Sequence, residues 1–145
     1  MNKDNPFWRR VAEDRLSNVT TLLGWFVDTY QERKREIQVR FHASESFTNP
    51  LGKVQGGMLA AMLDDCMGPA IYALLDEDEV AVTLRMSTTF LLPASPGPLQ
   101  GIGTLYRRRG KYCYTKGMLL DGDDRTVATA KACYKILPMP KGITP

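Results

Sequence analysis

The stretch Gly56–Leu75, GGMLAAMLDDCMGPAIYALL, is the most informative part of this chain of 145 residues about its fold. Of its twenty residues only Asp64 and Asp65 are charged, and almost all the others are apolar. A helix that is apolar on nearly every face is buried on every face. About 20 apolar residues would also span a membrane, but two central aspartates and Pro69 oppose that interpretation. The stretch therefore predicts a helix in the core of a globular domain.

Alternation of apolar and polar residues on both sides of this helix predicts a β-sheet around it. Before the helix, Glu36–His42 alternates strictly. After the helix, Val80, Val82, Leu84 and Met86 are expected to face one way. Three further strands with hairpin-like connections are predicted over Leu99–Tyr106, Tyr112–Leu120 and Thr126–Leu137.

The N-terminal segment predicts helices. Asn5 and Pro6 are typical of an N-cap and a first helical turn, and the apolar spacing from Phe7 to Tyr30 fits one or two amphipathic helices. The aromatic side chains of this segment are expected to pack on the sheet rather than to cover a pocket, namely Trp8, Trp25 and Phe26.

These elements together predict a single α+β domain over residues 1–145. An antiparallel sheet, whose last four strands form a meander, is expected to wrap around the long buried central helix. A helical extension over about residues 5–30 is expected to precede it.

The composition removes several function classes. A net charge of +3 is too small to indicate a nucleic-acid-binding protein. The three cysteines are odd in number and form no C-x-x-C motif, so neither a disulfide framework nor a cysteine-rich zinc site is expected. His42 is the only histidine and no G-x-S-x-G motif exists, which opposes a histidine-based zinc site and a serine hydrolase. Reduced thiols and a charged N-terminus without an apolar signal core favour a cytoplasmic protein.

The adjacent aspartates are the unusual feature of the buried helix. An ionised carboxylate among apolar residues is unfavourable unless it is paired or hydrogen-bonded. Asp64 and Asp65 therefore either reach a solvated edge, or one of them is the general base or nucleophile of an active site. Neighbours on an α-helix lie about 100° apart, so only one of the two can point at a given site.

The pair Gly56-Gly57 at the start of the helix indicates a second chemical feature. The first N–H groups of a helix lack intrahelical partners and lie at the positive end of its dipole. Glycine lets a ligand carbonyl oxygen approach these groups closely, as an oxyanion hole requires. Taken alone, however, the two glycines are more typical of a tight turn from loop to helix.

Together these features resemble a known family. The segment Asn49-Pro50-Leu51-Gly52-Lys53-Val54-Gln55-Gly56-Gly57, followed by Asp64, resembles the N-x-x-G-x-x-H-G-G-x(6)-D signature of PaaI-like hotdog-fold acyl-CoA thioesterases. The resemblance runs from about Phe41 to Leu137 and includes the order of helix and strands. It implies a hotdog fold, hydrolysis of an acyl-CoA thioester, and a homodimer or dimer of dimers with the active site between subunits.

The resemblance also implies roles for the matching residues. Asp64 would activate water or attack the thioester carbon, and the Gly56 backbone N–H would hold the developing oxyanion. Asn49 would hydrogen-bond the water or orient the reacting groups. Thr83 matches the Ser or Thr that the family places near the carboxylate from a facing strand. Since the carboxylate and the Asn-Gly loop come from different subunits in the family, a monomer is expected to be inactive.

One position departs from the family pattern. Gln55 stands where histidine is usual. Its amide can donate a hydrogen bond to the thioester carbonyl or to the loop, but it cannot titrate near neutrality, so any proton transfer at this position is lost. His42 does not replace it, because alternation along its strand predicts an edge or surface side chain.

A basic run indicates where the CoA moiety binds. Arg107–Tyr112 places four cations and an aromatic ring at a hairpin, and CoA carries phosphates that such cations bind. A solvated turn explains the same run about as well from the residues alone. In the related thioesterases the matching turn lies beside CoA. The predicted substrate and CoA contacts are Gly57, Phe90, Arg108, Arg109, Gly110, Lys111 and Tyr112.

The leading hypothesis is an acyl-CoA thioesterase that needs no metal and no cofactor beyond the coenzyme A of its substrate. An alternative is a non-catalytic acyl-CoA-binding protein, a ligand sensor or carrier, which Gln55 favours and Asp64, Asn49 and Thr83 oppose. A hotdog dehydratase or hydratase ranks last, because that chemistry usually pairs a histidine with a carboxylate. No nucleic-acid or membrane partner is expected.

Overall fold

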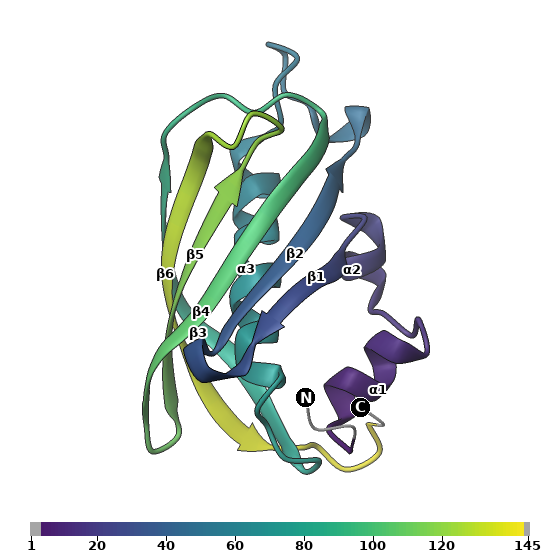
Figure 1. Cartoon of the computed structure of the whole chain (residues 1–145), viewed down its shortest axis with the longest axis vertical. Coiled ribbons are helices and arrows are strands. Elements are labelled where there is room, and N and C mark those ends of the chain that lie inside the picture. The colour runs from purple at the N-terminus through teal and green to yellow at the C-terminus, as the bar shows by residue number, and fades with distance from the viewer. Residues whose placement is uncertain (1–3, 144–145) are drawn as a thin grey trace.

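The central helix forms where the sequence places it. In the computed structural model, which describes residues 4–143, α3 runs from Gly56 to Tyr72 in the hollow of a curved sheet (Figure 1). Its second half is buried without interruption from Cys66 to Ile71, whereas Gly57 is exposed and both aspartates are only partly covered. The helix is therefore buried on every face at one end only. No helix among the described residues is long and apolar enough to span a membrane.

Six antiparallel strands form one sheet in the order β1-β2-β4-β5-β6-β3. Short 3₁₀ segments lie at Glu32–Lys34 and Glu45–Phe47. The sheet wrapped around α3 is the α+β hotdog architecture that the sequence predicts. The strands are β1 (Phe26–Gln31), β2 (Glu36–Ala43), β3 (Glu79–Phe90), β4 (Gly97–Arg109), β5 (Tyr112–Leu120) and β6 (Thr126–Pro138).

The prediction that the last four strands form a meander is wrong for the first of them. β4, β5 and β6 pair in sequence order, but β3 pairs with β6 at the far edge of the sheet. Alternation reports which residues face the core and not which strand lies beside which. β3 is consequently an edge strand, and one side of its backbone has no strand partner among residues 4–143.

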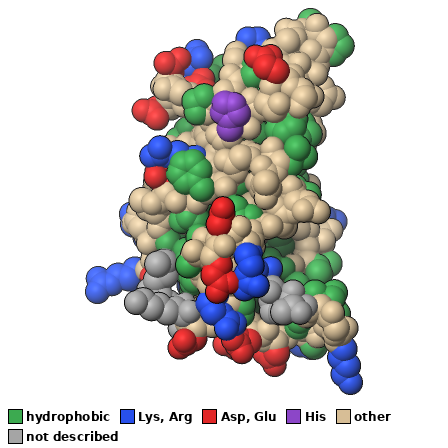
Figure 2. Space-filling model, turned by 90° about the vertical axis from the view of Figure 1, so that its right-hand side faces the viewer, with side chains coloured by type: hydrophobic (Ala, Val, Ile, Leu, Met, Phe, Trp, Pro, Cys, Tyr) green, Lys and Arg blue, Asp and Glu red, His purple; other side chains and the backbone are tan. Residues whose placement is uncertain are grey.

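The prediction of a purely helical segment over residues 5–30 is also wrong in its last part. The extension contains α1 (Pro6–Ala12) and α2 (Asn18–Leu22), but the chain then enters β1, which pairs with β2. Gly24 separates helix from strand with φ at +64°, a conformation that favours glycine. A Cβ there would also lie 2.9 Å from the Cβ of His42, whose side chain is exposed on this face (Figure 2).

A bulge in β3 overturns the predicted alternation of that strand. The pairing with β6 shifts between Thr83 and Arg85, so Leu84 is the extra residue. The Thr83 side chain before the bulge points towards α3, where it bonds to Asp64 and stays exposed, and Met86 after the bulge packs against the core, while Leu84 is 54% exposed. Val80, Val82, Leu84 and Met86 therefore do not share one face, because the bulge exchanges the two faces midway.

Glycines in the sheet let α3 approach it closely. A Cβ at Gly103 would lie 1.9 Å from the carbonyl oxygen of Cys66, and one at Gly117 would lie 2.9 Å from the Met67 side chain. Such contacts exclude any side chain at Gly103 without movement of the backbone. Gly103 of β4 and Gly117 of β5 thus serve helix packing, which positions Asp64 of α3 against the sheet.

Candidate active site

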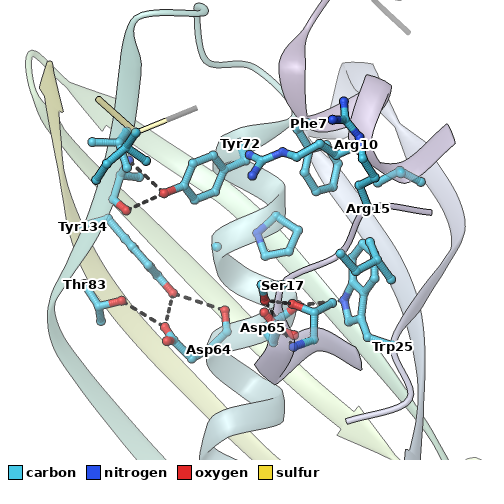
Figure 3. A pocket seen from close by; sticks show the side chains of 18 of the residues that line it. Phe7, Arg10, Arg15, Ser17, Trp25, Asp64, Asp65, Tyr72, Thr83 and Tyr134 are labelled. Carbon is cyan, nitrogen blue, oxygen red and sulfur yellow. Dashed lines mark hydrogen bonds between the residues drawn. The ribbon is translucent and has the colours of Figure 1, made fainter. Parts of the chain in front are cut away.

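Asp64 is held from the sheet by two hydroxyl groups. The Tyr134 hydroxyl donates a hydrogen bond to Asp64 Oδ1 at 2.6 Å, and Thr83 Oγ1 donates to the same oxygen at 3.1 Å (Figure 3). Thr83 and Tyr134 are register partners on β3 and β6, so both face the same turn of α3. Two donors on one carboxylate oxygen restrict its orientation and lower the cost of its partial burial.

Tyr134 is a candidate functional residue that the sequence analysis did not select. Burial and the neighbouring Asp64 carboxylate raise the pKa of the Tyr134 phenol, so it remains a hydrogen-bond donor at neutral pH. Alternation places Tyr134 on the inner face of the last strand, as it does several other residues. What singles it out is its register with Thr83, which depends on the unpredicted pairing of β3 with β6.

Asp65 turns away from the sheet towards the N-terminal helices. Its backbone carbonyl accepts a hydrogen bond from Trp25 Nε1 at 2.9 Å, and its side-chain Oδ2 is buried without a hydrogen-bond partner. Burial raises the pKa of Asp65 to about 6, and the charge of Asp64 adds to this effect while the nearby Thr20 hydroxyl opposes it. The two aspartates thus have different surroundings, as the angle between helical neighbours requires.

The N-terminus of α3 presents free backbone donors. The N–H groups of Met58 and Leu59 both bond to the Gln55 carbonyl, whereas no described residue accepts a hydrogen bond from Gly56 or Gly57. A Cβ at Gly56 would lie 3.4 Å from the ring of Phe90, which is 53% exposed. The structure therefore brings Phe90 beside the glycine that the resemblance assigns to the oxyanion.

Asn49 and Gln55 differ in how they are held. Asn49 Oδ1 accepts hydrogen bonds from the backbone N–H groups of Leu51 and Lys53, at 3.0 and 3.2 Å, so its carboxamide organises its own loop. The Gln55 side chain is exposed and caps no helical N–H, while its backbone N–H donates to Phe47. The amide of Gln55 is thus available to a ligand.

Within one chain, the carboxylate and the helix N-terminus are too far apart to act on one carbonyl group. Gly56 and Asp64 are separated by eight residues of helix, which corresponds to about 12 Å along its axis. An oxyanion donor and a base that serve the same carbon must both lie within about 3 Å of the reacting atoms. Within the described chain, the two groups that the resemblance assigns to one site therefore lie apart.

The basic hairpin lies at the end of β4 and β5, next to the sheet position of Tyr134, since Cys113 pairs with Tyr134 and Tyr112 pairs with Lys135. β4 extends to Arg109, so the arginines belong to a strand and only Gly110 and Lys111 form the turn. Arg108 pairs weakly with Glu79 at 3.8 Å, and its Nε donates to the Gly110 carbonyl. The cation of Lys135 lies 6.0 Å from the centre of the Tyr112 ring. The predicted CoA contacts are thus exposed at the end of the sheet.

A cavity of about 410 Å³ lies beside Asp64 and is lined in part by Asp64 itself. It is bounded by α3, by the start of β3 and by the N-terminal helices (Figure 3). From the sequence alone, packing on the sheet and covering a pocket are alternatives for Trp25. Trp25 is buried and also lines this cavity, so both descriptions apply to it. Trp8 is buried as expected, whereas Phe26 is exposed beneath the Arg40 guanidinium.

The remaining nucleophile near Asp64 is an inert thiol. Cys66 is fully buried, and this burial raises the pKa of its thiol, so it stays protonated. Within residues 4–143, no three His, Cys, Asp or Glu side chains gather closely enough to hold a metal ion.

Comparison with known proteins relates this geometry to a family. Residues 51–128, more than half of the chain, match the model of the thioesterase superfamily. The structure is similar to that of a proposed thioesterase, a phenylacetic acid degradation-related protein from Ralstonia eutropha JMP134. The two chains are 34% identical over 90% of this chain and 99% of the other, with a TM-score of 0.86.

More distant structures share the fold. A thioesterase from Haemophilus influenzae is 15% identical over 90% of this chain and 91% of its own, with a TM-score of 0.80. The PaaI protein of the phenylacetic acid degradation operon of E. coli is 15% identical over 92% and 95%, with a TM-score of 0.79. No curated protein matches the chain. The family match and the 34% identical relative show that this chain belongs to the thioesterase superfamily and is a thioester hydrolase.

Proposed function

We propose that the protein is an acyl-CoA thioesterase in which Asp64 is the catalytic carboxylate. The observation that carries this proposal is the orientation of Asp64 by Tyr134 and Thr83. Both donors bind Oδ1, and Oδ2 accepts no hydrogen bond from a described residue. The second oxygen is therefore available to a water molecule or to the thioester carbon.

The geometry suits two forms of the same reaction. As a general base, Asp64 takes a proton from water while the water oxygen attacks the thioester carbonyl carbon. The carbonyl oxygen becomes an oxyanion at the Gly56 N–H, and collapse of this intermediate expels the CoA thiolate and leaves the free acid. As a nucleophile, Asp64 attacks the carbon itself and expels the CoA thiolate, which leaves a mixed anhydride; water then hydrolyses it to the free acid and restores the carboxylate.

The complete site in this proposal contains residues of two copies of the chain. One copy supplies Asp64 and Thr83, and the other supplies Gly56 with its loop, since about 12 Å separates them within a copy. β3 supports this arrangement, because a long unpaired edge strand with exposed apolar side chains favours pairing with a second copy. A homodimer is thus the smallest active species, and a dimer of dimers repeats the same site.

The other predicted residues have supporting roles in the proposal. Asn49 keeps the loop before α3 in shape, and the Gln55 amide donates to the thioester carbonyl. Gly57 and Phe90 border the acyl thioester at the helix N-terminus. The exposed cations and the ring of the hairpin bind the CoA nucleotide, namely Arg108, Arg109, Lys111 and Tyr112 around Gly110.

The first test is release of free CoA from short, medium, long and aryl acyl-CoA esters, with Asp64→Asn in parallel. We expect turnover of at least one ester, its loss in the variant, and binding of the same ester by both proteins. Binding without turnover in the native protein would make it a carrier or sensor. Full turnover in Asp64→Asn would move the catalytic role to another residue.

A mixing experiment tests the division of the site between subunits. Asp64→Asn and Gly56→Val are each expected to be inactive, the second because a side chain at position 56 obstructs the oxyanion donor. When the two variants are unfolded and refolded together, mixed dimers contain one intact site, so part of the activity returns. If refolded mixtures stay inactive although mixed dimers are detected, both halves act within one chain.

A further inference from the structure

The cavity beside Asp64 has a floor made from one face of α3. Asp65, Gly68, Pro69 and Tyr72 line it, at the spacing of residues that share one side of a helix. The opposite wall comes from α1 and α2, which lie far from α3 in the sequence (Figures 1 and 3). Asp64 and Thr83 also line the cavity, so it opens directly onto the proposed catalytic carboxylate.

Gly68 keeps the floor of this cavity open. It lies inside α3 and is buried, yet a Cβ built on it would meet no atom within 4 Å. Glycine within a helix is less favourable than alanine by about 1 kcal/mol. Unlike Gly103, Gly68 has no contact with the sheet that excludes a side chain. Glycine relieves the crowding that a helical residue before a proline meets, here Pro69, and it also leaves the space beside it open to a ligand.

The wall formed by α1 is fixed to the end of α3. Asn5 Oδ1 caps α1 by accepting from the Phe7 N–H at 2.9 Å, and Asn5 Nδ2 donates to the carbonyls of Tyr72 and Leu75 at 3.1 and 2.8 Å. The side chain is 5% exposed, so these bonds are shielded from water. The cavity therefore has a preformed wall in the described chain.

Arg10 is the cation available within the cavity. It lines the cavity beside Tyr72, is only partly exposed, and forms no ion pair or side-chain hydrogen bond with a described residue. By contrast, Arg9 pairs with Glu77 at 2.7 Å outside the cavity, and Arg15, which also lines the cavity, is exposed and pairs with Glu13. The surface around this region carries both signs of charge (Figure 2). An anion in the cavity would therefore be recognised by Arg10 and not by an overall positive potential.

The cavity is polar at its ends and apolar between them. Tyr72 lies about 12 Å from Asp64 along the helix axis. An extended chain of eight carbon atoms covers about 9 Å, and the side chains of Asp64 and Arg10 reach inward over the remainder. Phe7 and Pro69 line the space between. Asp65 lines the same floor on the side of Ser17 and Trp25, about two helical turns along α3 from Tyr72 (Figure 3).

We propose that this cavity binds the acyl group and that Arg10 binds a carboxylate at its far end, so that the preferred substrates are CoA thioesters of medium-length dicarboxylic acids. This inference rests on the proposed function, because it places the thioester carbon at Asp64. Arg10 is a specificity-determining residue in this scheme and takes no part in the hydrolysis. A guanidinium that is partly removed from water binds a carboxylate well, whereas a methyl terminus leaves it without a partner.

The test compares suberyl-CoA with octanoyl-CoA, which have the same number of acyl carbon atoms. The native enzyme should show a kcat/KM for suberyl-CoA at least about tenfold higher, as expected for a hydrogen-bonded charge pair. Arg10→Gln should lose about tenfold or more with suberyl-CoA and less than about twofold with octanoyl-CoA. Arg9→Gln, the neighbouring arginine outside the cavity, is the matched control and should change neither value.

A second variant tests the location of the acyl group independently of charge. Gly68→Leu fills the floor of the cavity, so hydrolysis of both eight-carbon esters should fall while acetyl-CoA, which does not reach Gly68, is still hydrolysed. The thermal melting temperature confirms that the variant is folded.

The outcomes separate this inference from the proposed function. Equal rates for suberyl-CoA and octanoyl-CoA in both the native protein and Arg10→Gln, with turnover still dependent on Asp64, would overturn the inference alone. Undiminished octanoyl-CoA hydrolysis by folded Gly68→Leu would also overturn it. Absence of turnover with every CoA ester would overturn the proposed function and the inference together.

Discussion

Asp64 and Asp65 are neighbours in the sequence but lie in two different regions of the molecule. Asp64 faces the sheet, where two hydroxyl groups from β3 and β6 bind one of its oxygens. Asp65 faces the N-terminal helices, where one of its oxygens is buried without a partner. The pair shows that the chemistry of a carboxylate is set by the elements that pack against it and not by its immediate sequence.

This difference has a cause in the geometry of α3. A rotation of about 100° per residue directs one carboxylate to a layer rich in hydroxyl donors and the other to the extension. Two donors on one oxygen lower the free energy of an ionised carboxylate, while desolvation that the Thr20 hydroxyl offsets only in part raises that of Asp65. Asp64 is thereby suited to act as an oriented anion, and Asp65 is a source of instability at neutral pH.

The largest effect is expected on kcat when each of the two aspartates is replaced by asparagine. Asp64→Asn should lower kcat by about 10²- to 10⁴-fold, the usual contribution of a general base. Asp65→Asn is the matched control and should leave kcat within about threefold, since a side-chain change away from the reacting atoms alters the barrier little. Steady-state CoA release measures both. A collapse of activity in Asp65→Asn would reverse the assignment of the two residues.

Tyr134→Phe tests the donor that the sequence did not reveal. Removing a hydrogen bond to a charged group typically costs about 1.5–3 kcal/mol, so kcat should fall about 10- to 100-fold with little change in KM. Tyr106→Phe is the control, because Tyr106 is exposed on β4 and neither lines the cavity nor bonds to Asp64. An unchanged kcat in Tyr134→Phe would show that the phenol does not orient the carboxylate.

The stability of Asp65→Asn tests whether burial of the Asp65 carboxylate destabilises the native state. Burial raises the pKa of Asp65 to about 6, above its value in the unfolded chain, so the native state holds this proton more tightly. The free energy of unfolding therefore falls as pH rises from about 4 through 6, and Asp65→Asn lacks this contribution. At pH 8 the variant should be more stable by about 1–3 kcal/mol, with the difference vanishing near pH 4.

Urea unfolding of both proteins at the two pH values provides that measurement. The dependence on pH distinguishes an ionised buried carboxylate from a general packing effect, which would be the same at both values. A native protein that is as stable as Asp65→Asn at pH 8 would show that Asp65 is well solvated or paired.

The smallest expected effect concerns Thr83. Its hydrogen bond to Asp64 is longer than that of Tyr134, and its side chain is exposed, so water can replace it in part. Thr83→Val, which keeps the shape of the side chain, should lower kcat by about 2- to 10-fold. Thr83→Ser keeps the hydroxyl and should remain near the native rate. Equal losses in both variants would indicate that packing of the methyl group, and not the hydroxyl, matters.

Much of the fold could be predicted, because burial leaves a direct pattern in the sequence. The apolar run of Gly56–Leu75 and the strict alternation of Glu36–His42 each led to the correct element. The errors lie where a tertiary contact overrides the local pattern. Phe26–Gln31 is a strand because it pairs with β2, and β3 changes faces because of one extra residue opposite β6.

The sequence pointed to several residues of the candidate site but not to how they are arranged in space. The family motif pointed to Asp64, Gly56 and Thr83, and the structure places Thr83 against Asp64 but leaves Gly56 on a distant turn. Tyr134 could not be selected, because many side chains alternate into the core and only strand order shows which of them meets α3 at Asp64. Arg10 was likewise indistinguishable from Arg9 until the ion pair of Arg9 was seen.

Local sequence patterns were enough to predict a buried helix with two carboxylates, a helix N-terminus that begins with two glycines, and a sheet of alternating strands. They were enough because hydrophobic periodicity and backbone chemistry are local properties. Only the tertiary structure decided that β3 lies beside β6, that Tyr134 completes the surroundings of Asp64, and that the N-terminal helices close a cavity over Gly68. These outcomes depend on contacts between residues far apart in the chain, whose free energies are set by shape and register together.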